Sequence, residues 1–217
     1  ATALMRDGLR TNNLIPLSDP YRTPTYNVGF PTVNNPIVET INASVLNNQA
    51  SDGDNIVDWI FLELKDELSP FTTNQTRSAL VTKSGKVVDI DGVSPIYFKN
   101  VNAGNFNVQI RHRNHLGVSN NTVVPLTLSA TNTDFTASLA PAYNDPAVTT
   151  NPALRAMPVG VNPVVYGLYS GNGNGDRFAR NTGGTTTNDY SILLSNVTAT
   201  LGYYRNDYNM DGRVQIT

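Results

Sequence analysis

The chain has 217 residues, enough for one large domain or two small ones with a sizeable core. It is 39% hydrophobic and 15% charged, and its net charge of −2 gives no reason to expect a nucleic-acid partner. The lack of cysteine excludes disulfides, thiolate metal sites and thiol catalysis. No apolar run approaches the ~20 residues of a transmembrane helix, so we expect no transmembrane segment. The chain starts at Ala1 without a signal peptide, so we expect a mature fragment or a piece of a longer protein.

Residues 1–36 are expected to form an N-terminal arm. Its apolar residues allow either one or two helical turns near 4–9 or an extended arm that packs on the body of the protein. In the second case the packing residues would be Leu4, Leu9, Leu14, Ile15 and Leu17. Five prolines between positions 16 and 36 favour irregular backbone, because proline fixes φ and removes a hydrogen-bond donor.

Residues 37–135 are expected to form an antiparallel Ig-like β-sandwich, so the fold class is mainly β. A first strand is expected over 37–45. The strongest strand covers 56–65 and is apolar on both faces, which is typical of a central strand. Shorter strands separated by Gly and Asn turns are expected over 78–82, 86–90, 96–98, 105–113 and 123–129.

The remaining chain is expected to divide into a connector over 136–165 and a small segment over 166–217. Thr, Asn, Ala and Pro dominate the connector, which predicts little regular structure. The final segment holds two loops with oxygen-bearing side chains at alternate positions, and a helix is expected over 189–196.

The second of these loops in chain order spans residues 207–214 and shows the clearer pattern. Its oxygen donors at positions 1, 3, 5 and 7, the last a backbone carbonyl, would be Asp207, Asn209, Asp211 and Arg213. This spacing suits a hard cation such as calcium, because alternate residues point their oxygens inward and Gly212 allows a sharp turn. An acidic ligand is normal at position 12, which would be residue 218, so another group would have to complete the site. The competing interpretation is a polar β-turn around 211–212.

The first loop spans residues 172–178 and departs further from the pattern. Asn172, Asn174 and Asp176 occupy its first three ligand positions, but Arg177 stands where the glycine is expected. Position 12 falls on a glycine, so the nearest acidic ligand is Asp189, which an insertion would have to bring in. Two neutral ligands predict weaker calcium affinity than three carboxylates. A Gly/Asn-rich linker explains the same residues equally well.

The only histidines lie in the cluster Arg111-His112-Arg113-Asn114-His115. His112 is on the apolar face of its expected strand. An acid/base pair would need a carboxylate partner, for which the sequence offers Asp58, Glu63, Asp89 and Asp91. A structural, hydrogen-bonded role is favoured for both histidines.

No catalytic motif is found. The chain has no Gly-x-Ser-x-Gly elbow and no glycine-rich phosphate loop followed by Lys-Ser/Thr, so a non-catalytic protein is predicted. If the chain bound glycans, two or three coplanar rings should share one surface; the candidates are Trp59, Tyr97, Tyr203 and Tyr204. Trp59 is expected to be buried in the strongest strand, which counts against that alternative.

Several blocks in sequence order resemble a module of large secreted proteins of Bacteroidetes, whose members are described as haemagglutinin-like or uncharacterised. The blocks are Met5–Arg10, Leu14–Tyr21, Ile56–Trp59, Glu63–Asp66, Arg77–Leu80, Val88–Gly92, Arg111–Val118, Asp134–Thr136 and the two loops. Asn188-Asp189 matches a pair that follows the loop motif in this family. The stretched first loop and the shortened second loop depart from it.

The resemblance implies a secreted or cell-surface module, exported by type IX secretion, that ends in a dockerin-like pair of calcium loops. From it we expect a non-catalytic structural or adhesive module, as a subunit or fragment of a surface adhesin, fibre or filament. Its partners would be other protein subunits or a host or environmental surface, with glycans possible. The alternative is a carbohydrate-binding module of a secreted glycan-degrading system.

Overall fold

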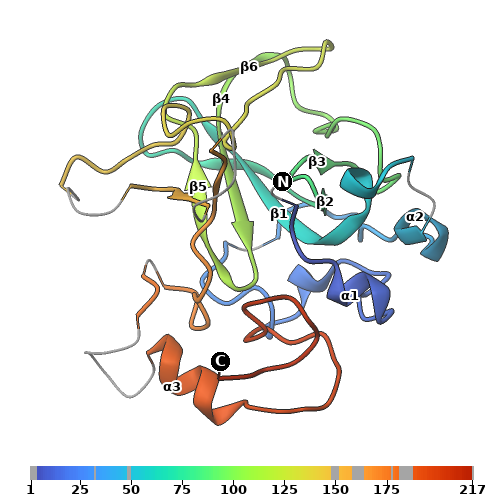
Figure 1. Ribbon diagram of the computed structural model, residues 1–217. Coiled ribbons are helices and arrows are strands. Elements are labelled where there is room, and N and C mark those ends of the chain that lie inside the picture. Colours follow the sequence, from blue (N-terminus) through green and yellow to red (C-terminus); the bar gives the residue numbers. More distant parts are fainter. Residues whose placement is uncertain are drawn as a thin grey trace.

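An antiparallel sheet of six strands forms the centre of the computed structural model (Figure 1). The structure describes residues 4–31, 33–47, 50–147, 152–157, 164–176, 178–180 and 188–216. The sheet has the order β3-β2-β1-β4-β5, and β6 also pairs with β4. Its strands are β1 (Ile56–Asp66), β2 (Thr73–Thr82), β3 (Val87–Val88), β4 (Gly104–His112), β5 (His115–Ser119) and β6 (Val124–Leu126). The prediction of a mainly β, antiparallel protein is confirmed.

Strand β1 is the central strand that the sequence predicts. It pairs with β2 on one side and with β4 on the other, and Phe61 lies opposite both Ser78 and Arg111. Its first nine residues are all buried, whichever face they point to. The run of apolar residues on both faces is explained by the burial of both faces of β1 in the core, in addition to its pairing on both edges.

The N-terminal arm packs into the same hydrophobic core as the sheet. Leu9, Ile15 and Tyr21 of the arm belong to one cluster with β1, β2 and Met210 near the C-terminus. The Tyr21 hydroxyl donates to the Trp59 carbonyl at 3.0 Å. The rings of Tyr21, Phe30 and Phe61 pack together, with distances of 5.3–5.5 Å between their centroids. The arm is therefore held by aromatic packing that also buries β1.

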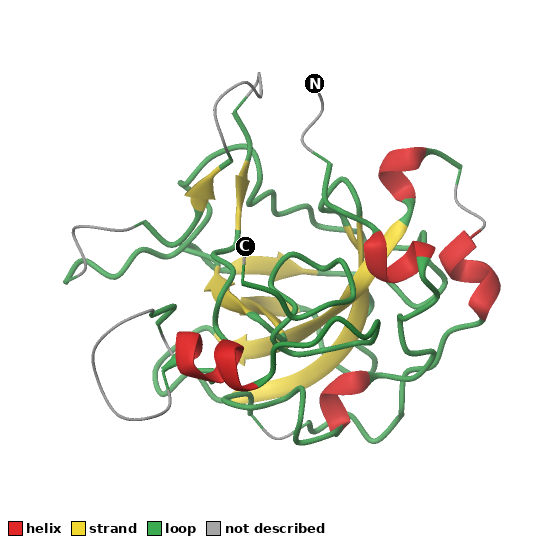
Figure 2. Ribbon diagram, turned by 60° about the horizontal axis from the view of Figure 1, so that its bottom comes forward, coloured by secondary structure: helices red, strands yellow, loops and turns green. Residues whose placement is uncertain are grey.

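The helices are short and lie around the sheet (Figure 2). They are α1 (Gly8–Thr11), α2 (Ala43–Asn47) and α3 (Asp189–Ser195), with 3₁₀ turns η1 (Pro20–Arg22) and η2 (Asp52–Asp54). The expected helix over 189–196 is found within one residue of its predicted end. It starts where the Asn188 side chain accepts from the Ser191 amide at 2.8 Å, a standard N-cap. No helix among the described residues is long and apolar enough to cross a membrane.

Three expectations for the body differ from the structure. Residues 37–45 make one isolated bridge, Thr40 to Ser18, and then enter α2, because the Asn42 side chain caps the Ser44 amide. Residues 96–98, all described, form no strand. Conversely, β5 has no counterpart among the expected strands.

A second sheet has two strands of two residues each, β7 (Arg155–Ala156) and β8 (Tyr166–Gly167). It lies at the end of the expected connector, where the Tyr166 amide donates to the Thr136 carbonyl at 2.9 Å. A small apolar cluster of Val118, Ala142 and Leu154 lies beneath this region. The connector is thus mostly irregular, as expected, but it is attached to the edge of the main sheet.

Candidate functional site

The C-terminal loop 207–213 is closed by hydrogen bonds from its backbone to its own side chains. Asp207 accepts from the amides of Asp211 at 3.1 Å and Gly212 at 2.8 Å. Asn209 accepts from the Asp211 amide at 3.2 Å, and Asp211 from the Arg213 amide at 2.9 Å. These bonds, with one from Asn209 Nδ2 to Asp211 at 3.0 Å, join the three predicted ligands in one hydrogen-bonded turn. Gly212 adopts φ +89°, the left-handed conformation that a sharp turn needs.

Asp207 is the buried member of this set. Its side chain has no exposed surface, and burial raises its pKa above the ordinary value despite the hydrogen bonds and the Arg113 charge, which favour the charged form. A buried carboxylate with such a pKa is more stable when a cation lies beside it. Each carboxylate oxygen carries two lone pairs, so the backbone bonds leave acceptor capacity for a metal. Arg213 offers only its carbonyl, since its side chain donates to Ala199 at 3.1 Å.

The ends of this loop are attached to the chain before it. The Thr198 amide donates to the Val214 carbonyl at 3.0 Å, and the Gly202 amide to the Gly212 carbonyl at 2.9 Å. On the other side, α1 approaches so closely that a Cβ at Gly8 would lie 2.9 Å from the Cα of Asp211. The loop is therefore fixed from two directions.

The structure brings Asp189 to the first loop. The Asp189 carboxylate accepts from the amides of Asn174 at 3.1 Å and Arg180 at 2.7 Å. Asn174 accepts from the Asp176 amide at 3.0 Å, and the Asn172 side chain donates to the Asp176 carbonyl at 3.1 Å. All four predicted ligands of this loop thus belong to one hydrogen-bonded group. Arg177 and the glycine at position 12 lie outside the described residues.

The oxygen of the Asn172 side chain is available for a further partner. Asn172 is 7% exposed, and its Oδ1 accepts no hydrogen bond from the described part of the chain. Asn206 is similar, with 6% exposure and an Oδ1 without a described donor. Oxygens of Asp19, Glu39, Gln75 and Ser78 are likewise buried without a described donor, but those of Asn172 and Asn206 lie at the loops, where a cation or water would satisfy them.

The two loops lie against each other at the bottom of the molecule (Figure 1). A Cβ at Gly173 would lie 2.2 Å from the Tyr208 hydroxyl and 2.9 Å from Asn206 Oδ1. The Tyr208 hydroxyl donates to the Asp189 carbonyl at 3.4 Å. The first loop also touches the arm, because a Cβ at Gly175 would lie 2.1 Å from the Val28 carbonyl oxygen.

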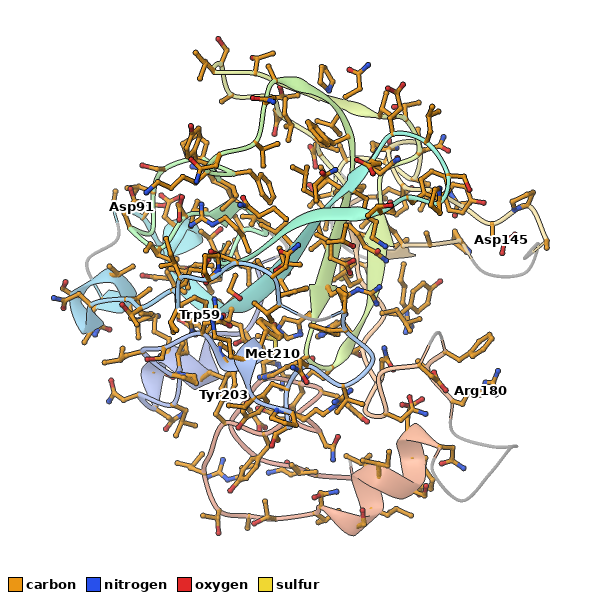
Figure 3. The ribbon with its side chains drawn as sticks, turned by 180° about the vertical axis from the view of Figure 1, so that it is seen from behind. Trp59, Asp91, Asp145, Arg180, Tyr203 and Met210 are labelled. Carbon is orange, nitrogen blue, oxygen red and sulfur yellow. The ribbon has the colours of Figure 1, made fainter. Side chains whose placement is uncertain are left out.

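Behind the loops lies a buried polar cluster centred on Asp58. Its carboxylate accepts from the Tyr203 hydroxyl at 2.6 Å and lies 3.0 Å from His112 Nε2 and 2.9 Å from Arg113 Nη2. The Arg113 guanidinium also stacks on the Tyr203 ring at 4.3 Å. Figure 3 places Tyr203 beside Trp59 and Met210 in the interior, whereas Asp145 and Arg180 are peripheral.

Charge pairing determines the ionisation of this cluster. Burial alone would raise the pKa of Asp58, but the Arg113 charge and the His112 hydrogen bond hold it below the ordinary value. Burial likewise opposes the charge of Arg113, and the neighbouring Asp58 charge raises its pKa above the usual range. The pKa of His115 is lowered well below 6.5 by burial and by His112. Since a carboxylate only accepts, His112 presents Nε2–H to Asp58.

This cluster contains the histidine–carboxylate contact that an enzyme would need. Asp58 is completely buried and His112 is 4% exposed, so neither is presented to a substrate. Two shallow cavities, of about 350 and 390 Å³, lie elsewhere. They are lined by Arg22, Asn27, Phe30, Pro31 and Val33, and by Val197, Thr198, Ala199, Val214, Gln215 and Ile216.

The sequence pointed to the loop residues but left the partner of the histidines open among four carboxylates. Asp58 is that partner. A signal was present, since an aspartate between Val57 and Trp59 in a strand apolar on both faces requires a buried counter-charge. Asn114 and Asn206 gave no such signal, because their environments are made by residues far away in the chain.

No described group of three or more His, Cys, Asp or Glu side chains is placed to hold a metal ion. To hold calcium, the predicted loops would need amide and backbone oxygens beside their carboxylates, which are normal calcium ligands. No protein-family model matches the chain, and comparison with curated proteins and with solved structures gave no significant match.

Proposed function

We propose that this chain is a non-catalytic extracellular module, structural or adhesive, whose C-terminal loops bind calcium. The observation that carries this proposal is the closed loop of Asp207, Asn209 and Asp211. It brings two carboxylates and one amide, which carry hard oxygen ligands, into one hydrogen-bonded turn, and the buried Asp207 would gain from a bound cation. The chemistry of this donor set fits calcium, which takes 6–8 oxygens.

When bound, calcium supplies a charge that offsets the buried carboxylate and fixes the loop. Asp207, Asn209 and Asp211 would hold it with side-chain oxygens, and Arg213 with its carbonyl. In the first loop, Asn172, Asn174, Asp176 and Asp189 would do the same, more weakly because two of them are neutral. We expect affinities of ~10⁻⁴–10⁻³ M, typical of extracellular modules.

The dockerin-like description is proposed for residues 166–217, where two oxygen-rich loops lie against each other and a helix follows the first. An Ig-like sandwich would need two sheets packed face to face. The described strands form one six-stranded sheet and one two-stranded sheet, so a sandwich would depend on a very small second layer. Residues 37–135 are therefore described as an antiparallel sheet only.

The surface role is proposed from the resemblance to secreted and surface proteins of Bacteroidetes, with type IX secretion as the route. A subunit of an adhesin, fibre or filament requires a stable module more than a catalytic cleft. The carbohydrate-binding alternative has less support. Trp59 is completely buried, and the Tyr203 hydroxyl is bonded to Asp58, so two of its four candidate rings are used internally.

Thermal unfolding with and without calcium tests the proposal, in this protein and in a variant with a glutamate added after Thr217 as a twelfth ligand. At 100 times the dissociation constant, calcium should stabilise by about 2.7 kcal/mol. For a chain of this size the melting temperature should then rise by roughly 5–11 °C. Asp211→Asn should remove most of this rise, because the variant loses one negative charge of the site. It keeps the acceptor for the Arg213 amide, so the loop itself should be little disturbed.

The matched control is Asp91→Asn. Asp91 caps a similar Asp-Gly turn by accepting from the amides of Val93 and Ser94, at 2.9 and 2.8 Å, but belongs to neither loop. This variant should respond to calcium like the unmodified protein. A melting curve that chelator leaves unchanged would refute calcium binding.

A further inference from the structure

Asn114 stands at the point where the two loops meet the sheet. It lies in the two-residue turn between β4 and β5 and is completely buried. Its side-chain Nδ2 donates to the Asp207 carbonyl at 2.6 Å. Its backbone carbonyl accepts from the amides of Gly171 at 2.9 Å and Asn172 at 3.1 Å. One residue thus holds position 1 of both loops, Asn172 and Asp207.

The orientation of the Asn114 side chain is itself fixed. Its Oδ1 accepts from Nδ1–H of His115 at 2.6 Å, and the same nitrogen lies 3.0 Å from Nδ1 of His112, which is an acceptor because its ring proton is on Nε2. His112 is in turn held by Asp58 through Nε2. The amide group can therefore neither turn over nor move away without breaking bonds to the buried cluster. The histidines act here as positioning residues for Asn114.

The chain before the first loop is also attached to β5. The Leu116 amide donates to the Tyr169 carbonyl at 2.8 Å, and His115 forms a bridge with Ser170. A shift of the first loop would therefore move the turn at Asn114. Because the Asn114 side chain also donates to the Asp207 carbonyl, a shift of this turn would displace the second loop. The direct packing of Gly173 against Tyr208 gives the loops a second contact.

We propose that Asn114 couples the two loops, so that calcium bound in one raises the affinity of the other. This inference rests on the proposed calcium function. Calcium in the second loop fixes Asp207 and, through Asn114 Nδ2, the turn whose carbonyl holds Gly171 and Asn172. The coupling is reciprocal by thermodynamic necessity, and its usual size is about five- to 150-fold in affinity.

Calcium titration calorimetry on single-loop variants measures this coupling. Asp176→Ala disables the first loop, and Asp211→Ala the second. In the protein with Asn114, disabling one loop should weaken the other by at least about fivefold. In the Asn114→Ala background the weakening should fall to less than about twofold, because the hydrogen bond from Asn114 to Asp207 is lost and only the packing of Gly173 on Tyr208 still joins the loops. An equal effect in both backgrounds would overturn the proposal.

Asn120→Ala is the matched control. Asn120 is also a buried asparagine of the sheet, 4% exposed, but its side chain bonds to Val108, Thr122 and Asn107. It should leave the coupling unchanged even if it lowers stability. Loss of coupling in this variant as well would show that general loosening, and not the Asn114 link, is responsible.

Amide hydrogen exchange without calcium separates this inference from the calcium function. Asn114→Ala should speed exchange at Asp211 and Gly212, whose amides bind the Asp207 carboxylate, by about tenfold or more. Unchanged exchange would refute the positioning role even if calcium binds. Absence of calcium binding with faster exchange would refute the calcium function and the cooperativity, and leave Asn114 as a structural support.

If Asn114→Ala does not fold, the unmodified turn still gives a test. In calcium, Asp211→Ala should reduce the calcium-induced protection of the Gly171 and Asn172 amides, which belong to the other loop. Protection that is independent of the second loop would overturn the coupling.

Discussion

Replacing Asp58 by Asn should cost this protein a large part of its stability. Asp58 and Arg113 both have no exposed surface, and 2.9 Å separates the Arg113 Nη2 from the carboxylate. Asparagine keeps the shape of the side chain but removes the charge. The Arg113 guanidinium would then be buried without its nearest counter-charge, with Asp207 as a weaker one, and its nitrogens have no hydrogen-bond acceptor among the described residues.

The expected loss follows from breaking a buried ion pair on one side, which costs about 3–5 kcal/mol. For a domain of this size each kcal/mol lowers the melting temperature by about 2–4 °C, so the fall should be roughly 6–20 °C. Removing both partners together is less damaging, because no charge is left uncompensated. The double variant Asp58→Asn/Arg113→Met should therefore be more stable than the sum of the two single changes predicts.

Urea unfolding of the four proteins at pH 7 measures these quantities. The coupling energy from the double-mutant cycle should reach 1–3 kcal/mol, on the order expected for residues in one network. Asp91→Asn, which alters an aspartate near the surface, should cost less than about 1 kcal/mol. If Asp58→Asn also costs less than about 1 kcal/mol, or the cycle is additive, the buried pair does not stabilise the fold as argued.

Two further changes test other parts of the structure. The pKa of His115 is below 6.5 in the folded protein, so folding stability should be full above pH 6.5 and should decline as the pH falls below it, by up to about 1.4 kcal/mol per pH unit. His115→Gln should flatten this slope in urea titrations between pH 5 and 6.5, and an unchanged slope would assign the decline to other groups. Gly8→Ala should destabilise despite the better helix propensity of alanine, because the new Cβ would lie 2.9 Å from the Asp211 Cα. Gly53→Ala, where the nearest atom is 3.6 Å away, should be close to neutral in the same melts, and equal effects would refute the close packing of α1 on the second loop.

The local patterns of the sequence were sufficient for most of the central sheet. The apolar run at 56–65 predicted β1, and the alternation at 105–113 predicted β4. The apolar-rich segment 189–196 predicted α3. These predictions succeeded because strand and helix periodicity are properties of neighbouring residues.

Secondary-structure predictions failed where a side-chain hydrogen bond or a very short turn determined the local structure. Residues 37–45 contain enough β-branched residues for a strand, yet Asn42 caps Ser44 and starts α2. Strand β5 was missed because a turn of only two residues, Arg113 and Asn114, separates it from β4. The sequence at this turn is the charged cluster 111–115, and its side chains bond to Asp58 and Asp207, which lie far away in the chain.

The sequence by itself determined the alternating oxygens of the two loops, the central strand and the burial of Trp59. Only the tertiary structure decided that Asp58 is the partner of His112, that Asp189 reaches Asn174, and that Asn114 joins Asn172 to Asp207. The first set depends on spacing within about ten residues. The second joins positions between 15 and 93 residues apart, which no local periodicity encodes, because those contacts exist only once the core has brought the segments together.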